Sequence, residues 1–381
     1  MQNIQKQISR LYLSTVLGSL SLTGAWVAIL ASRGYTLVEI GLAETAFHIT
    51  SLILEIPSGV LADVFGRKNM LFVSSIMRMT GNIIMIFSGN LFMVCISMMF
   101  QAASYNFSSG SGEALAYDSL KSVKQEVRYE KYASNQLILY RLCGGISTLC
   151  AGFALFIGYQ AAYGVDLLIG TAQMWILCSL SEVRCCEHEK NEQGLQPESA
   201  VQSKKIRAAI LAIRSKLISC FLTSLDFMKK ARSAVLLMVC NSMVGAVDVL
   251  LLFFLQAKLP KAGLPDHMLG FALFFMQLGG ILGAKTILRY KELRYRSIVV
   301  ITVSLVLCGV LAEYSGMYLL MTAGGFAAAL GDDALQVRTN TILQDMFPSE
   351  QRATLISMES FIFSVIMIVL SPLAGIWFSR W

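Results

Sequence analysis

The sequence predicts an all-α, polytopic membrane protein, and its composition and hydropathy pattern both support this fold class. Of its 381 residues, 55% are hydrophobic and only 14% are charged, and the mean hydropathy is +0.62. A soluble globular domain carries about 25% charged residues, so this composition excludes one. Long apolar runs with only six prolines indicate membrane helices, whereas a β-barrel would show alternating segments of about ten residues.

Eleven apolar segments follow one another along the chain, and each is predicted to be a membrane helix of about 20 residues. They lie at about 11–31, 38–58, 69–88, 91–116, 133–157, 160–180, 232–256, 266–288, 297–312, 316–345 and 353–378. No small-residue cleavage site follows the first segment, so it is predicted to be a retained helix and not a signal peptide.

Lysines and arginines in the loops predict the orientation. The N-terminus and every second loop after it are basic, whereas the loops between them carry few cations. Because cytoplasmic loops are enriched in Lys and Arg, the N-terminus is predicted to be cytoplasmic, in the cytoplasmic membrane. The net charge of +7 then reflects topology in a lipid bilayer, and it gives no reason to expect a nucleic-acid partner.

Residues 182–230 lose the apolar character and gain charge. They are predicted to be a cytoplasmic linker between an N-terminal six-helix bundle (1–181) and a C-terminal bundle (231–381). Apolar residues recur at helical spacing within the linker, among lysines and arginines: Ile206, Ile210, Ile213, Leu217 and Phe221. This pattern predicts an amphipathic helix on the inner leaflet, and a solvated linker with incidental periodicity is the alternative.

An internal repeat with an offset of about 220 residues supports the two bundles. Residues 59–62 match 280–283, residues 112–115 resemble 331–335, and residues 130–134 resemble 350–354. Three similar offsets in order indicate two copies of one six-helix unit, as in transporters with parallel repeats. The counterpart of the sixth segment would begin near residue 380, so a twelfth helix is expected that the sequence lacks. Truncation is the favoured explanation, and an eleven-helix variant is the alternative.

The stretch from Gly59 to Lys68 is predicted to be a tight loop at the membrane surface. Glycine lets helix ends approach, Asp63 can accept hydrogen bonds at a helix start, and Arg67 suits a phosphate-rich face. The pattern Gly-x-Leu-Ala-Asp-x-x-Gly-Arg-Lys resembles the signature loop between helices two and three of the major facilitator superfamily. The resemblance implies two pseudo-symmetric six-helix bundles, and a gating loop made by Gly59, Asp63, Gly66, Arg67 and Lys68.

Helix two carries the most distinct polar stripe inside the membrane. Glu44, His48, Ser51 and Glu55 fall within about 60° of one another on a helix, so they are expected to line the central cavity. Ionisable groups inside a membrane face a cavity or a partner, and two carboxylates beside a histidine could take up and release a proton. The alternative is that Glu55 belongs to the packed helix end and that His48 is a satisfied interhelical donor.

Further ionisable residues are predicted to form gate pairs at the inner face. Glu113 and Asp118 can pair with Arg67, Lys68 or Arg141 and hold the inward gate shut. Arg141 is also a candidate for the central cavity, as the cation that a charged substrate would need; inside the membrane it must have a partner, and Glu113 is its first candidate.

The second half of the sequence contains a similar set. Asp332, Asp333 and Arg338 of helix ten are also assigned to the inner-gate pairs. Asp248 of helix seven has no cation close in the sequence. It is predicted to be a substrate contact or a proton site, or else a structural partner of Arg338 or Lys285.

The family resemblance implies a monomeric secondary transporter that moves a small organic solute by alternating access. Proton-coupled efflux of drug-like compounds is favoured, and uptake of a sugar, peptide or metabolite is the alternative. A non-transporting membrane receptor or sensor is the alternative of another class. No P-loop, metal-ligand spacing or nucleophile with a base is found in the sequence, so we expect no enzyme, no metal and no cofactor, with a proton gradient as the energy source.

Overall fold

The computed structural model describes residues 2–182, 231–290, 292–346 and 352–379, and these residues are helical with no strand. The helices of the N-terminal half (residues 2–182) are α1 (Gln2–Ser19), η1 (Leu22–Ala25), α2 (Trp26–Ser32), α3 (Leu37–Phe65), α4 (Arg67–Phe87), α5 (Leu91–Ser108), α6 (Ser111–Lys121), η2 (Glu126–Arg128), α7 (Tyr129–Leu149), α8 (Ala151–Ile157) and α9 (Tyr159–Cys178). Those of the C-terminal half (231–379) are α11 (Arg232–Lys261), α12 (Asp266–Ile287), α13 (Tyr295–Glu313), α14 (Tyr318–Met346) and α15 (Arg352–Phe378).

Each of the eleven predicted segments corresponds to one helix or to two or three consecutive helices. Nine described helices are long and apolar enough to cross a membrane, or ten if the bent pair α7 and α8 is one span. Helix α14 spans 29 residues but is not among them, because Asp332 and Asp333 lower its hydropathy. The predicted all-α membrane fold is confirmed. The amphipathic helix predicted around residues 206–221 lies outside the described residues.

Three segments predicted as single helices are broken. The first is interrupted at Leu20 and Ser21, the fourth at Ser109 and Gly110, and the fifth bends by 46° between α7 and α8. Gly110 has φ +70°, a left-handed conformation that glycine adopts without steric cost. Hydropathy does not report such breaks, because it averages over a whole segment.

The predicted loop from Gly59 to Lys68 is wrong in extent. Helix α3 continues to Phe65 and α4 begins at Arg67, so Gly66 alone has non-helical geometry. Its φ of +98° favours glycine, and its N–H donates to Ala62 O at 3.0 Å. The polar composition of this stretch therefore belongs to the end of a long helix and not to a loop.

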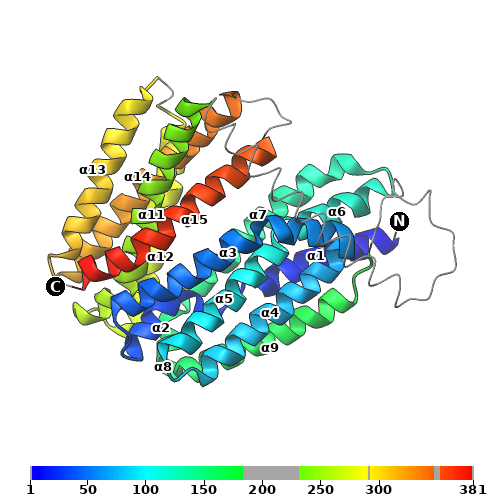
Figure 1. Ribbon diagram of the computed structural model, residues 1–381, viewed down its shortest axis with the longest axis horizontal. Helices are drawn as coiled ribbons and strands as arrows, with labels where there is room; N and C mark the ends of the chain where they lie inside the picture. The colour runs from blue at the N-terminus through cyan, green and yellow to red at the C-terminus, as the bar shows by residue number, and fades with distance from the viewer. Residues whose placement is uncertain (1, 183–230, 291, 347–351, 380–381) are drawn as a thin grey trace.

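The two halves form two helical bundles that converge at one end (Figure 1). They meet where α2 and α8 lie near the C-terminus, and they diverge toward the end that holds the N-terminus. Glycines allow backbone contact at the convergent end: a Cβ added at Gly375 of α15 would lie 2.5 Å from Leu37 O of α3, and one at Gly152 of α8 would meet Asp266 O of α12. Such close approach through small residues is typical of helix packing in membranes.

Candidate functional site

A cavity of about 680 Å³ lies between the two bundles. Helices α3, α4, α5, α7 and α9 and the broken first segment supply one side, and Val249, Phe253 and Phe363 of the C-terminal half supply the other. Its walls are rich in aromatic rings: Trp26, Phe47, Tyr105, Tyr140, Tyr163, Phe253 and Phe363. The ring of Trp26 meets that of Phe253 edge-on at a centroid distance of 5.5 Å, so an aromatic contact joins the halves at this cavity.

Asp166 of α9 fills the break in the first segment. Its Oδ2 accepts from Ser21 Oγ at 2.6 Å and from Thr23 Oγ1 at 2.5 Å, and its Oδ1 accepts from Leu22 N at 2.7 Å. The carboxylate is buried, with 6% exposure. The first N–H groups of a helix have no internal partner and favour a negative charge. Asp166 therefore satisfies the groups that the break would leave without partners.

Arg78 of α4 lies on the other side of the same break. Its Nη1 donates to Gly18 O at 2.7 Å and its Nη2 donates to Gln173 Oε1. The last carbonyls of a helix favour a cation, so the two ends of the break meet side chains of opposite charge. Irregular backbone at membrane depth occurs where protein buries it or where it lines a cavity. Leu20, Ser21 and both charged residues line this one.

Arg78 and Asp166 are not among the site residues predicted from the sequence. Each is an ionisable residue inside an apolar segment, and that feature alone could have identified both as site candidates.

The structure brings two members of the predicted stripe on α3 into contact. His48 Nε2 lies 3.2 Å from Glu44 Oε1, both residues have 7% exposure, and both line the cavity. The other two members lie elsewhere. Ser51 Oγ accepts from Asn106 Nδ2 at 3.0 Å, and Glu55 accepts a hydrogen bond from Ser360 of α15. Glu55 is therefore not part of the pair that Glu44 and His48 form.

A second cavity, of about 790 Å³, extends from the first toward the N-terminal end. The two share lining residues, including Phe47, Arg78, Tyr105 and Tyr140. The two cavities therefore adjoin each other, and the second extends to Glu113.

Glu113 does not pair with Arg141 as expected. Its Oε1 accepts from Gln136 Nε2 at 3.0 Å, and no ion pair joins Glu113 to Arg141 among the described side chains. The charge of Arg141 acts instead on Asp333 of the opposite bundle. The sequence prediction looked for a partner within one bundle, whereas the fold places α7 and α14 on opposite sides of the interface.

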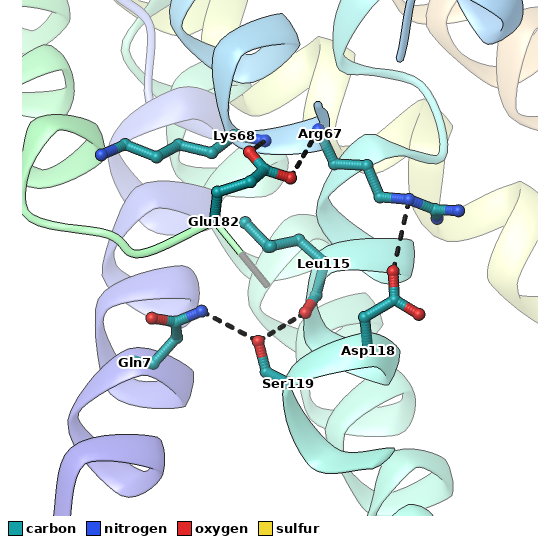
Figure 2. Close-up of polar contacts among 7 residues, drawn as sticks. All are labelled: Gln7, Arg67, Lys68, Leu115, Asp118, Ser119 and Glu182. Atoms are coloured by element: carbon teal, nitrogen blue, oxygen red, sulfur yellow. Dashed lines mark hydrogen bonds and ion pairs between the residues drawn. The ribbon is translucent and has the colours of Figure 1, made fainter. Parts of the chain in front are cut away.

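Glu182 caps the start of α4 at the predicted gating turn, as Figure 2 shows. Its Oε1 accepts from Arg67 N at 2.9 Å and its Oε2 accepts from Lys68 N at 2.8 Å. The sequence analysis assigned this capping role to Asp63, and the structure gives it to a residue that follows α9. The side chain of Asp63 lies outside the described part of the structure.

The predicted pair of Arg67 and Asp118 is present, with Nε and Oδ2 3.4 Å apart (Figure 2). Nearby, Gln7 Nε2 donates to Ser119 Oγ at 2.8 Å, which ties α1 to α6. All these residues belong to the N-terminal half. The contacts therefore brace one bundle, and the gating role of Gly59, Gly66, Arg67 and Lys68 stays a prediction.

Three aspartates lie close together in the C-terminal half. Asp248 is buried, with 4% exposure, and the charges of Asp332 and Asp333 act on it. A Cβ added at Gly280 of α12 would meet the carboxylate of Asp333. Arg338 Nη2 donates to Tyr290 O at 2.8 Å. The structure therefore gives Asp248 two carboxylate neighbours, and the assignment of α14 residues to the inner gate stays a prediction.

Comparisons with known proteins agree with this geometry. The model of the Major Facilitator Superfamily matches residues 11–311. The solved structure of the nucleoside transporter NupG has a TM-score of 0.70 at 12% identity, over 98% of this chain and 90% of that chain. The D-xylose-proton symporter gives 0.67 at 9%, and the peptide transporter POT in complex with sulfate gives 0.67 at 13%; each comparison covers 98% of this chain and 90% of the other. None of the curated proteins matches the sequence. At these identities the likeness shows the fold alone.

Proposed function

Since the chain belongs to the Major Facilitator Superfamily and resembles solved structures of transporters in its fold, we propose that it moves a small organic solute in exchange for protons. Substrate binds in the cavity between the bundles, and the halves rock about it so that the cavity opens to each side in turn. The protein lies in the cytoplasmic membrane with its N-terminus in the cytoplasm, as the basic loops indicate. The protein acts as a monomer.

The position of the cavity supports this proposal most directly. Both halves line it, the halves make backbone contact at the convergent end, and the space continues toward the N-terminal end. Alternating access requires a site that both repeats share near the bilayer midplane. With the N-terminus in the cytoplasm, the conformation described here faces inward.

Glu44 and His48 are the proton-binding pair in this proposal. A proton that binds to this pair changes its net charge inside the membrane, where charge is costly. Both side chains line the substrate cavity, so the protonation state of the pair and the presence of substrate influence each other. Glu55 is the second proton candidate, since it is half-buried two turns further along α3.

Export of an amphipathic, drug-like compound suits the aromatic walls. Tyr105 and Tyr140 are 61% and 57% exposed, and with Met85 and Met98 they offer an adaptable apolar surface. Uptake of a polar metabolite is the second candidate. The amides of Asn82 and Gln101 favour it, and Gln101 Nε2 donates to Asn82 Oδ1 at 2.7 Å. Such amides suit the hydroxyl or amide groups of a sugar, nucleoside or peptide.

Flux measured in proteoliposomes tests the proposal. We expect counterflow with at least one member of a panel of amphipathic dyes and polar metabolites, and faster flux under an imposed pH gradient. Glu44→Gln and His48→Gln should keep counterflow and lose the acceleration by the pH gradient. Glu130→Gln, at an exposed position, is the matched control and should behave as the wild type. Saturable binding without flux for any compound would show a receptor in place of a transporter.

A further inference from the structure

We propose that the C-terminal half binds a monovalent cation in a cavity between α11, α14 and α15. The ligands are the carboxylates of Asp332 and Glu359, the amide oxygen of Asn241 and the hydroxyl of Ser242. The cation is an alkali ion such as Na⁺ or the ammonium group of a substrate. This site is distinct from the pair of Glu44 and His48, and it goes beyond the transport function proposed above.

The cavity has a volume of about 270 Å³, and all four residues line it. The carboxylate of Asp332 lies against α11, because a Cβ added at Gly245 would be 3.4 Å from Asp332 Oδ1. Asn241 Nδ2 donates to Glu359 Oε1 at 2.9 Å, so α15 is joined to α11 at the same place. Oxygen atoms from three helices therefore converge on one small space.

Two of these oxygens have no hydrogen-bond partner in the described structure. They are Asn241 Oδ1 and Ser242 Oγ, on residues with 6% and 3% exposure. The bond to Glu359 fixes the orientation of the Asn241 amide, since a flipped amide would place two oxygens against each other. A buried polar atom without a partner is costly, and a bound cation would satisfy both oxygens at once.

The electrostatic environment favours a cation at this site. The charges of Asp332 and Asp333 act on Asp248, and these three carboxylates and Glu359 belong to the membrane-embedded part of one half. Ionised carboxylates inside a membrane need a counter-charge. The charge of Arg141 reaches Asp333 from the other half. A cation beside Asp332 and Glu359 would supply a second counter-charge.

The ligand set favours a monovalent cation over a structural metal ion. Among the described residues, no group of three or more His, Cys, Asp and Glu side chains is placed to hold a metal. The four oxygen-bearing residues are fewer than the about six to eight oxygen ligands that Ca²⁺ takes, or the octahedral set that Mg²⁺ demands, so a monovalent cation fits them better.

The cation cavity adjoins the central cavity. Val249 and Phe363 line both, and the ring of Phe363 lies 5.7 Å from that of His48. An ammonium group could therefore occupy the acidic cavity while the rest of its molecule contacts the aromatic walls. A bound alkali ion would instead neutralise the charge of Asp332 on α14, beside the bound substrate.

Thermal unfolding of the purified full chain in detergent micelles tests the site. One arm adds NaCl, with N-methyl-D-glucamine chloride to hold the ionic strength constant. The other arm adds benzylamine and compares it with benzyl alcohol, an uncharged molecule of the same shape. We expect the unfolding temperature to rise with Na⁺, with benzylamine or with both, and not with benzyl alcohol. A response to Na⁺ alone indicates an inorganic ion, and a response to benzylamine alone indicates an organic ammonium.

Three variants locate the response. Asp332→Asn and Glu359→Gln should weaken the apparent cation affinity ~10-fold or more, because each removes a charged ligand. Asp345→Asn, on the same helix but exposed, should leave it unchanged. Ser242→Ala provides a further check if the charge variants fold poorly. Loss of a buried hydroxyl without a partner should not lower the unfolding temperature in the absence of cation, yet it should reduce the rise that the cation causes.

The proposal is overturned if neither cation raises the unfolding temperature, or if Asp332→Asn, Glu359→Gln and Ser242→Ala all respond as the wild type does. Counterflow by the same preparations is a separate readout. Flux without any cation response would reject this site and leave the transport proposal standing.

Discussion

The two halves of the molecule use glycine differently at positions that the internal repeat matches. Gly59 and Gly112 of the N-terminal half have open space where a Cβ would be, whereas their counterparts Gly280 and Gly331 are crowded. A Cβ at Gly331 would lie 3.2 Å from the Cα of Thr302. Small residues in the C-terminal half thus bring helices together, and Gly112 instead lines the cavity of about 790 Å³. The same sequence pattern serves packing in one half and open volume in the other.

The two halves also differ in how their buried charges are arranged. In the N-terminal half, Asp166 accepts hydrogen bonds at one end of the helix break and Arg78 donates at the other. In the C-terminal half, Asp248, Asp332 and Asp333 place charges of one sign close together. The N-terminal half therefore compensates these two buried charges internally. The C-terminal half does the same for Lys258 and Glu313, whereas the charge that reaches Asp333 of its aspartate cluster comes from Arg141 of the other bundle.

The largest effect is expected at the helix break. Asp166→Asn should destabilise the protein by about 3 kcal/mol, because the amide presents an N–H to groups that donate to the carboxylate. Asp266→Asn, at an exposed position, is the control for loss of one negative charge. Unfolding of both variants in detergent micelles, followed by heat or denaturant, measures the difference. Equal stability of the two variants would show that the break does not depend on Asp166.

Glycines that match in the repeat test the packing contrast. Gly331→Ala should destabilise the protein by about 1–3 kcal/mol, because the added methyl group would lie 3.2 Å from the backbone Cα of Thr302, which cannot rotate away. Gly112→Ala should be neutral or stabilise the protein by up to ~1 kcal/mol, since the position is helical and has open space. Thermal unfolding of the two variants side by side checks the sign of each. Destabilisation by both would mean that the halves are packed alike.

Opposite responses are expected when one buried carboxylate of each half is neutralised. Asp248→Asn should change stability by less than about 1 kcal/mol or increase it, because it relieves repulsion from Asp332 and Asp333. Asp166→Asn, in contrast, should destabilise. A loss at Asp248 as large as that at Asp166 would point to a cationic partner of Asp248 and would remove the charge contrast between the halves.

The smallest effect is expected at the ion pair of Arg67 and Asp118. Its side chains are 33% and 18% exposed, so solvent screens their attraction, and a double-mutant cycle with Arg67→Gln and Asp118→Asn should give a coupling of about 0.2–1 kcal/mol. A coupling of several kcal/mol would mean that the pair holds more than α4 and α6 together. Transport by the same variants tests the predicted gating role, which fails if both transport as the wild type does.

Much of the fold could be predicted from the sequence, because hydropathy is a local property of each segment. The eleven apolar segments were found in this way. The contact of Arg67 with Asp118 is one of the charge pairings that the sequence allowed at the inner face. The helix break and its partners could not be predicted, since the bond from Ser21 to Asp166 joins residues 145 positions apart. For the same reason the capping group of α4 was assigned to the nearby Asp63 and not to Glu182, and the charge partner of Arg141 was sought in Glu113 and not in the other half.

Cross-linking across the convergent end tests whether the two halves move about their shared cavity. Gln277 Nε2 of α12 donates to Thr148 Oγ1 of α7 at 3.1 Å, so these positions join the halves. Cysteines at both, in a chain whose nine native cysteines are replaced, can be bridged by a short bis-methanethiosulfonate, which forms a disulfide with each thiol. Alternating access predicts that the bridge stops counterflow in proteoliposomes and that reduction of the two disulfides restores it. Undiminished counterflow in the bridged protein would contradict alternating access.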